Sequence, residues 1–245
     1  MSNGFINEYE LISSLDNKHY NELNSNLQSA IRIFFKGSNY NSERIIARHC
    51  TGQGKPDISI KIGSVEKLIS IKIGTGNSVH QEPVETFIEY LGEQFGITEE
   101  IADCIRHFIW GDDTLDGCGM VCERLSASQY RNSFPDKITK LKEYFETHKS
   151  DLIKRFVLIG KNGIRPIDFL YHGNVINGSC ISAEDILNFL TDGCNTSRSA
   201  VPVGGLCFQA WNRVLNGNTY LDSRRGVIQL KWPSLEADLH KLIKR

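Results

Sequence analysis

Two short runs of alternating apolar and polar residues stand out in the first third of the chain. They cover residues 56–62 and 67–73, and Gly63-Ser64 lies between them. Alternation with a period of two is typical of β-strands that bury one face, and glycine next to serine favours a tight reversal. The pattern therefore predicts a β-hairpin.

Apolar residues recur at helical spacing elsewhere, which predicts several amphipathic helices. The expected helices cover residues 18–36, 82–95, 99–110, a stretch after 135, 182–190 and 234–244. In the second of these, Pro83 fits the first helical position because its missing N–H needs no partner there. Glu82 would then cap this helix, and Glu85 would lie in its first turn, where the helix dipole favours an acid.

Further strands are expected at residues 45–49 and at the continuous apolar run 156–159, which is typical of a strand buried on both faces. After residue 162 the pattern changes to short strands. Gly173-Asn174 predicts a hairpin turn, and residues 205–211 and 226–232 indicate two more strands. We therefore expect a mixed core over residues 1–162 and a strand-rich region over residues 163–245, with one compact domain as the alternative.

The composition is that of an ordinary globular protein, with 40% hydrophobic and 23% charged residues in 245. No apolar run approaches the length that crosses a bilayer, so we expect no membrane partner. The start of the chain has no basic segment followed by an apolar one, and the seven cysteines are an odd number without a tight framework. Both observations favour a cytoplasmic protein with reduced thiols.

Charge is distributed unevenly along the chain, although the formal net charge is only −1. Residues 1–150 carry more acidic than basic side chains, and residues 151–245 carry more basic than acidic ones. A polyanion would therefore be attracted to the C-terminal region.

The predicted hairpin carries a candidate reactive site. Asp57 follows Pro56 at the start of the first strand, and Lys72 lies near the end of the second. A hairpin of this kind can bring a carboxylate and an ammonium group together. The pair suits metal-assisted hydrolysis of a phosphodiester, in which the acid holds a hard divalent cation and the lysine positions or deprotonates the attacking water.

Pro56-Asp57 together with Ser70-Ile71-Lys72 resembles the motif of the PD-(D/E)XK nuclease superfamily, and within it the small type II restriction endonucleases. The resemblance implies an α/β fold, with a restriction-endonuclease-like mixed central β-sheet flanked by helices and a strand-rich C-terminal recognition region. It also implies Mg²⁺ as the cofactor, held by Asp57 and a strand carbonyl near Ile71, with Lys72 acting on water.

One position departs from the family pattern. The family usually has an acid two residues before the lysine, and here that residue is Ser70. A subgroup with serine there takes its acid from the following helix, which makes Glu82 and Glu85 equal candidates for the missing metal ligand. The family also sometimes adds a carboxylate from its first helix, and Glu22 and Glu43 lie near the first predicted helix. Favourable helix-start charges are the simpler explanation of Glu82 and Glu85.

The C-terminal region supplies the groups that read DNA. Arginine can contact guanine through two hydrogen bonds, asparagine and glutamine can contact adenine in the same way, and lysine binds phosphate. For each candidate, a solvated charge or a local hydrogen bond is an equally good explanation. The candidates are Asn195, Arg198, Gln209, Arg213, Arg224, Arg225 and Lys231.

We therefore predict a type II restriction endonuclease that cuts double-stranded DNA at a specific site with Mg²⁺, as a monomer or a homodimer. A cognate DNA methyltransferase is expected genetically rather than as a bound subunit. The alternatives are a repair nuclease or one without sequence choice, an inactive DNA-binding protein whose Ser70 marks a decayed site, and a structural or interaction protein.

Overall fold

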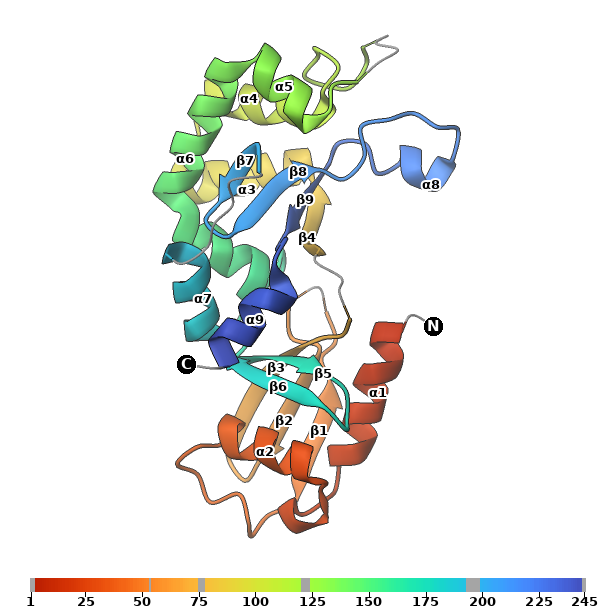
Figure 1. The fold of residues 1–245 in the computed structure, drawn as a ribbon, viewed down its shortest axis with the longest axis vertical. Helices are drawn as coiled ribbons and strands as arrows, with labels where there is room; N and C mark the ends of the chain where they lie inside the picture. The colour runs from red at the N-terminus through yellow and green to blue at the C-terminus, as the bar shows by residue number, and fades with distance from the viewer. Residues whose placement is uncertain (1–2, 53, 75–77, 120–123, 193–198, 244–245) are drawn as a thin grey trace. The chain divides into compact units, whose positions relative to one another are not determined.

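The computed structural model describes residues 3–52, 54–74, 78–119, 124–192 and 199–243 (Figure 1). The chain forms two compact units, each made of segments that are distant in sequence. The first unit comprises Met1–Gly76, Val157–Phe189 and Ser234–Arg245, and the second comprises Asn77–Phe156 and Leu190–Pro233. The boundary expected near residue 162 lies inside the second segment of the first unit. None of the described helices is long and apolar enough to cross a membrane.

The first unit is built on a five-stranded mixed sheet with the strand order β1-β2-β3-β5-β6. Neighbouring strands are antiparallel except for β3 and β5, which are parallel. The β2–β3 hairpin turns at Gly63, whose φ of +58° favours glycine. The strands are β1 (Ile45–His49), β2 (Ile58–Ile62), β3 (Val65–Lys72), β5 (Phe169–Gly173) and β6 (Gly178–Ser182).

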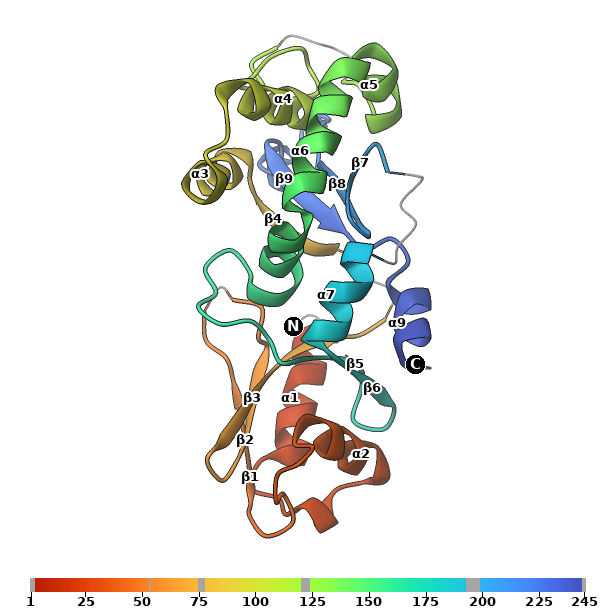
Figure 2. The same ribbon diagram turned by 90° about the vertical axis from the view of Figure 1, so that its left-hand side faces the viewer.

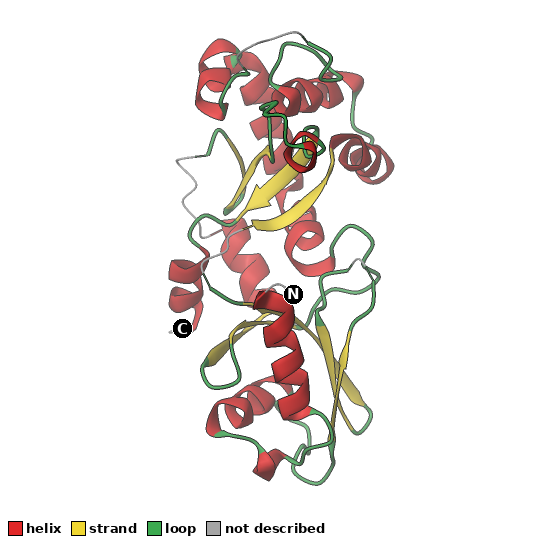
Figure 3. Cartoon of the chain, turned by 90° about the vertical axis from the view of Figure 1, so that its right-hand side faces the viewer, coloured by secondary structure: helices red, strands yellow, loops and turns green. Residues whose placement is uncertain are grey.

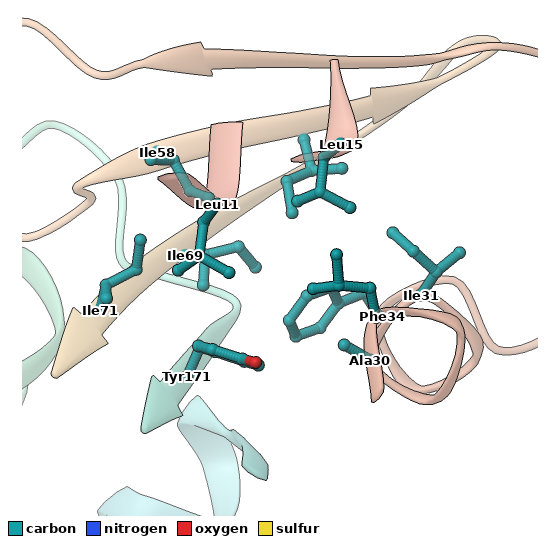
Figure 4. A pocket seen from close by; sticks show the side chains of 11 residues that line it. Leu11, Leu15, Ala30, Ile31, Phe34, Ile58, Ile69, Ile71 and Tyr171 are labelled. Atoms are coloured by element: carbon teal, nitrogen blue, oxygen red, sulfur yellow. The ribbon is translucent and has the colours of Figure 1, made fainter. Parts of the chain in front are cut away.

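Two helices, α1 (Asn3–Leu15) and α2 (Ser25–Phe34), cover one face of this sheet, and the short helix η1 (Tyr20–Glu22) connects them. Their apolar side chains meet those of the strands in a common core (Figure 4). The space left there is only about 10 Å³, about the size of one water probe. This region is therefore a packed core and not a ligand site. On the same sheet, α9 (Leu235–Ile243) packs against β6.

The second unit contains a four-stranded antiparallel sheet with the order β4-β9-β8-β7. Its strands are β4 (Ser78–Pro83), β7 (Val201–Val203), β8 (Leu206–Ala210) and β9 (Val227–Lys231). Helices pack on one face, where Phe208 of β8 contacts the rings of Phe87, Phe108 and Phe145. Figure 2 views this unit from the side of α6, and Figure 3 views it from the opposite side.

The helices of this unit follow β4 or connect its later strands. They are α3 (Val84–Phe95), α4 (Glu99–Trp110), α5 (Ala127–Ser133), α6 (Pro135–Ile153) and α8 (Thr219–Asp222). A π-helical segment, η2 (Lys154–Ile159), continues α6, and α7 (Ala183–Asp192) follows β6. At the start of α7, Ser182 Oγ accepts a hydrogen bond from the N–H of Asp185 at 3.0 Å, as an N-cap serine does.

Most of the expected elements are confirmed, including the hairpin of β2 and β3, the 45–49 strand, α4 and α6. A hairpin of β5 and β6 also forms, but its turn covers residues 174–177, because Gly173 still belongs to β5. Two expectations are wrong. Residues 156–159 belong to the helical η2 and not to a strand, because a short apolar run does not distinguish a buried strand from a buried helix. Glu82 lies in β4, and the following helix begins only at Val84. The helices α1 and α5 were not expected, and the 18–36 helix is divided into η1 and α2.

Candidate active site

The β2–β3 hairpin brings Asp57 and Ser70 into direct contact. The N–H of Asp57 donates to the carbonyl of Ile69 at 2.9 Å, which fixes Asp57 beside β3 just before β2 begins. Ser70 Oγ donates to Asp57 Oδ2 at 3.0 Å, and the N–H of Ile71 donates to the same oxygen at 2.5 Å. Two neutral donors therefore hold one carboxylate oxygen, and neither of them uses Oδ1.

Lys72 lies on the same side of the sheet as the Asp57 carboxylate. Side chains alternate along a strand, and Ile69 and Ile71 point into the core beside α1 and α2 (Figure 4). Ser70 and Lys72 therefore point to the other side, where Ser70 contacts Asp57. Lys72 is half-buried at the end of β3. The hairpin thus assembles the expected acid, serine and lysine on one surface.

Glu8 of α1 is an acid that the sequence analysis did not select. Burial raises the pKa of its carboxyl, and the negative charge of Asp57 raises it further, whereas His49 and Lys72 lower it. The charges of Asp57 and Lys72 therefore both act on the Glu8 carboxyl. His49 Nδ1 lies 3.8 Å from Glu8 Oε2, and Phe5 stacks on the His49 ring at 5.6 Å. The start of α1 is therefore held against β1.

The acids expected near the first predicted helix serve other purposes. Glu22 accepts the N–H of His19 at 2.6 Å and so stabilises η1. Glu43 lies against the hairpin turn at Gly63, at the opposite end of the strands from Asp57. The helical spacing of Leu11 and Leu15 could have predicted α1, but it does not mark Glu8 as an acid that interacts with Asp57.

The donor set suits a magnesium ion better than a softer metal. Asp57 and Glu8 offer carboxylate oxygens, which hard divalent cations prefer. Within the described ranges, no group of three or more histidine, cysteine, aspartate or glutamate side chains is arranged to hold a metal. Magnesium is commonly held by only one or two carboxylates, with waters and substrate phosphate as the other ligands. The Asp57 carboxylate is a donor of the kind that this ion prefers.

A hollow of about 230 Å³ opens next to Pro56, the neighbour of Asp57. Leu68 of β3 lines it together with the loops before β2 and after η2. These loops contribute Cys50, Thr51, Gly52, Gly54, Asn162, Gly163, Ile164 and Arg165. Leu68 lies on the same face of β3 as Ser70 and Lys72, but Asp57, Ser70 and Lys72 are not among the residues that line the hollow.

Glu82 is engaged in a buried ion-pair network of the second unit. Its Oε2 accepts from Arg155 Nη2 at 2.6 Å, and its Oε1 lies 2.9 Å from His80 Nε2. The Arg155 guanidinium in turn lies 3.7 Å from the centre of the Tyr90 ring. Burial alone would raise the pKa of Glu82, but the hydrogen bonds and charges of His80 and Arg155 outweigh it and lower the pKa. Both carboxylate oxygens are thus used by cationic or imidazole partners.

Glu85 lies in the first turn of α3, as expected, and is more exposed than Glu82. Arg106 of α4 donates to it from Nη2 at 3.0 Å and also contacts Glu99 and Asp103. Both Glu82 and Glu85 belong to the second unit, whereas Asp57 and Lys72 belong to the first. Each carboxylate therefore has a strong partner within its own unit.

Two of the arginines expected to contact DNA have internal partners. Arg213 donates to the carbonyls of Phe108 at 2.5 Å and Leu125 at 3.0 Å, and burial lowers the pKa of its guanidinium to about 10. Arg225 donates to the carbonyl of Gly117 at 3.2 Å and lies 3.6 Å from Asp112. These contacts attach both ends of the 213–225 segment to the neighbouring helix and loop.

The other candidates have different surroundings. Gln209, Arg224 and Lys231 lie on or beside the helix-free face of the second unit's sheet, where they are half-buried or exposed. Asn195 and Arg198 lie outside the residues that the structure describes. Among the candidates that the structure describes, those without buried backbone partners therefore lie on the strands or, as Arg224 does, between α8 and β9.

The fold is that of a restriction endonuclease, a mixed α/β architecture with a mixed sheet flanked by helices, which confirms the expected fold class. Among solved structures, the chain is similar to restriction endonuclease MspI in complex with its cognate DNA, with a TM-score of 0.59. The similarity covers 93% of this chain and 88% of that one, at 13% sequence identity. At this identity the likeness shows the fold alone. No family model matches the sequence, and no curated protein matches it either.

Proposed function

We propose that the protein is a Mg²⁺-dependent endonuclease that hydrolyses phosphodiester bonds in double-stranded DNA at a specific site. The observation that carries this proposal is the arrangement of Asp57, Ser70 and Lys72 on one surface of the β2–β3 hairpin. The fold supports it, because the similar MspI structure is a restriction endonuclease in complex with its cognate DNA.

Each residue of this surface has a distinct role in the proposed reaction. Asp57 and Glu8 would hold the ion, and the carbonyl of Ile71 would complete the protein's share of the ligands. When bound, the ion offsets the negative charge that builds up on the phosphate in the transition state. Lys72 orients the attacking water and assists the loss of its proton. Ser70 positions Asp57 through its hydroxyl and does not carry charge itself.

Glu8 takes the place of the acid that Ser70 lacks, in preference to Glu82 and Glu85. Glu8 interacts electrostatically with Asp57 and Lys72, whereas the carboxylates of Glu82 and Glu85 are bound by Arg155 and Arg106. Releasing Glu82 from its buried partners would break its buried ion pair with Arg155, which is costly. An acid from α1 requires no such rearrangement.

The decisive experiment is cleavage of unmodified plasmid and phage DNA by the purified protein, with Mg²⁺ or with a chelator. Discrete fragments that require Mg²⁺ are expected. Lys72→Ala should lower the cleavage rate by about 10²- to 10⁴-fold and leave DNA binding intact. Lys61→Ala is the matched control, because Lys61 is an exposed lysine of the same hairpin. Wild-type cleavage by Lys72→Ala would contradict the assignment.

The neutral Ser70 also favours a second candidate, a DNA-binding protein that does not cut. The same assay separates the two functions. Binding to DNA with no cleavage of any substrate, at any Mg²⁺ concentration, would favour the inactive binder. A smear in place of bands would indicate a nuclease without sequence choice.

A further inference from the structure

The helices α3, α4 and α6 lie on one face of the second unit's sheet, and its other face is turned away from them (Figure 3). Phe208 and Leu230 point toward the helices α3, α4 and α6 and are buried. The alternate side chains point away from those helices. They include Ser78 and Gln81 of β4, Cys207 and Gln209 of β8, and Val227, Gln229 and Lys231 of β9.

Three glutamines form a row across this face. Gln81 pairs with Gln229, and Gln229 pairs with Gln209, so one residue from each of three adjacent strands lies at the same level. Their amides are joined in sequence. Gln209 Nε2 donates to Gln229 Oε1 at 3.0 Å, and Gln229 Nε2 donates to Ser78 Oγ at 3.1 Å. Gln81 Nε2 donates to the same Ser78 oxygen at 3.1 Å.

The row is fixed in advance of any binding event. Gln229 is only 7% exposed, so its amide is held in one orientation by its two partners. Ordering several long side chains costs conformational entropy, and the cost is already met before a partner arrives. Gln209 uses one N–H in the row, which leaves its amide oxygen and second N–H for a partner. A side-by-side donor and acceptor is the pattern that adenine matches in the major groove.

Cations flank the row. Arg224 Nη1 donates to Gln81 Oε1 at 3.4 Å, and its guanidinium lies 5.6 Å and 5.1 Å from the ring centres of Trp211 and Tyr220. Lys231 follows Gln229 along the same face of β9 and pairs with Cys207 and Ser78 in the sheet. The outward positions of the described strands include no aspartate or glutamate. The surface therefore combines neutral amides with positive charge.

We propose that this surface, defined by Ser78, Gln81, Gln209, Gln229, Arg224 and Lys231 and called the glutamine face, reads base edges in the major groove of DNA. Gln209 and Gln81 contact the bases, while Arg224 and Lys231 contact phosphate. A β-sheet can enter a DNA groove and present its side chains in this way. The inference rests on the proposed function for its ligand, but it concerns a different unit of the chain from the hairpin that carries Asp57.

The test measures binding of the full chain carrying Lys72→Ala to a library of short duplexes with a randomised central stretch. Further substitution of Gln209 or Gln81 by Ala should lower the preference for one A·T pair by about 10- to 100-fold. Binding to unrelated duplexes should change little. Arg224→Ala and Lys231→Ala should weaken binding to every duplex and lower the slope of log affinity against log salt by about 1.

The control is Gln94→Ala, because Gln94 is an exposed glutamine of α3 on the helical side of the unit. Gln209→Glu provides a second variant that keeps the shape of the side chain and adds a charge that repels phosphate, so it should weaken binding to all duplexes. Urea unfolding of each variant separates loss of binding from loss of folding. Unchanged base preference in folded Gln209→Ala and Gln81→Ala proteins would overturn the inference.

The outcomes also separate this inference from the proposed function. Cleavage at the same sites by Gln209→Ala and Gln81→Ala enzymes with Lys72 intact would overturn the glutamine face and leave the nuclease proposal standing. Loss of base preference in a protein that cuts nothing would support the glutamine face and refute the nuclease. A third outcome is that the parent protein does not bind DNA but self-associates, and that Gln209→Glu abolishes the self-association. This outcome would identify the glutamine face as a protein interface and overturn the inference.

Discussion

Asp57 in the first unit and Glu82 in the second are both held by hydrogen bonds, but their partners differ in charge. The Asp57 carboxylate accepts from a serine hydroxyl and a backbone N–H. The Glu82 carboxylate is bound by the Arg155 guanidinium and lies against His80. Neutral donors fix a carboxylate and leave its negative charge available, whereas a buried arginine neutralises it.

The comparison shows how to distinguish a ligand-binding acid from a structural one in this chain. Asp57 immediately precedes β2 and Glu82 lies within β4, and both were candidates from the sequence. The charge of the partner separates them, because a cation site needs a carboxylate that has not already been compensated. By this criterion we propose Asp57, together with Glu8, as the acids of the cation site, and the network of Glu82, Arg155 and His80 as a structural element of the second unit.

The largest expected effect belongs to Asp57→Asn. The amide keeps the shape of the side chain but loses the negative charge, so the ion should bind poorly. We expect cleavage to fall by about 10³-fold, since a metal contributes several kcal/mol to transition-state stabilisation. The urea midpoint of unfolding should change little, because the donors that Asp57 has among the described residues are a hydroxyl and a backbone N–H, both neutral. A fully active Asp57→Asn protein would show that Asp57 is not the acid that holds the ion.

Glu82→Gln should act on stability and not on cleavage. We expect its free energy of unfolding to fall by about 3 kcal/mol. The substitution leaves the buried Arg155 without its counter-charge. The pKa of Glu82 is lowered from its ordinary value of 4.5, so the ionised form stabilises the folded state. This stabilisation is complete above pH about 4.5 and is lost as the pH falls toward the lower pKa of the folded state.

Urea unfolding of wild type and Glu82→Gln across this pH range measures that difference. The gap between the two free energies of unfolding should shrink as the pH falls. The control is Glu85→Gln, because the Glu85 side chain is 56% exposed and an exposed ion pair contributes at most about 1 kcal/mol. If Glu82→Gln were stable but inactive, Glu82 would be the relocated acid after all.

Sequence reasoning found the parts of the site that are determined locally. The alternation around Gly63-Ser64 predicts the hairpin, and the hairpin alone brings Asp57 into contact with Ser70. The secondary-structure prediction failed for β4, because Pro83 and the acids beside it suggested the start of a helix. The strand state of Glu82 depends on pairing with Ile228 of β9, which is far away in sequence. No local pattern contains that information.

Glu8 was missed for a similar reason. Its helix is fixed by packing of Leu11 and Leu15 on the sheet and by the contact of Phe5 with His49, and no strong capping signal marks its start. Arg213 and Arg225 show the reverse limitation. Their residue type is typical of DNA contacts, but tertiary structure places them on backbone carbonyls. Residue type predicts chemistry only where exposure is known.

Glu8→Gln tests whether α1 supplies the second acid. We expect cleavage to fall by about 10- to 100-fold, in the range found when a group that supports a metal site is changed, and the Mg²⁺ concentration for half-maximal rate should rise. Glu10→Gln is the matched control, since Glu10 is an exposed acid of the same helix. Equal effects of the two substitutions would show that Glu8 acts only through the general charge of α1.

The smallest expected effect is that of Ser70→Ala. The hydroxyl supplies one of two neutral hydrogen bonds to Asp57 Oδ2, and the N–H of Ile71 supplies the other. Losing one bond to a charged group costs about 1.5 kcal/mol, which corresponds to about a 10-fold lower rate.

Ser70→Asp gives the sharper test, because it restores the usual acid of the motif next to Asp57. If Glu8 already provides the second carboxylate, Ser70→Asp should not raise the cleavage rate, since two adjacent acids repel each other. If Ser70→Asp instead makes the enzyme faster and insensitive to Glu8→Gln, the chain lacks a second acid in its natural form, and Asp57 holds the ion with less help than we propose.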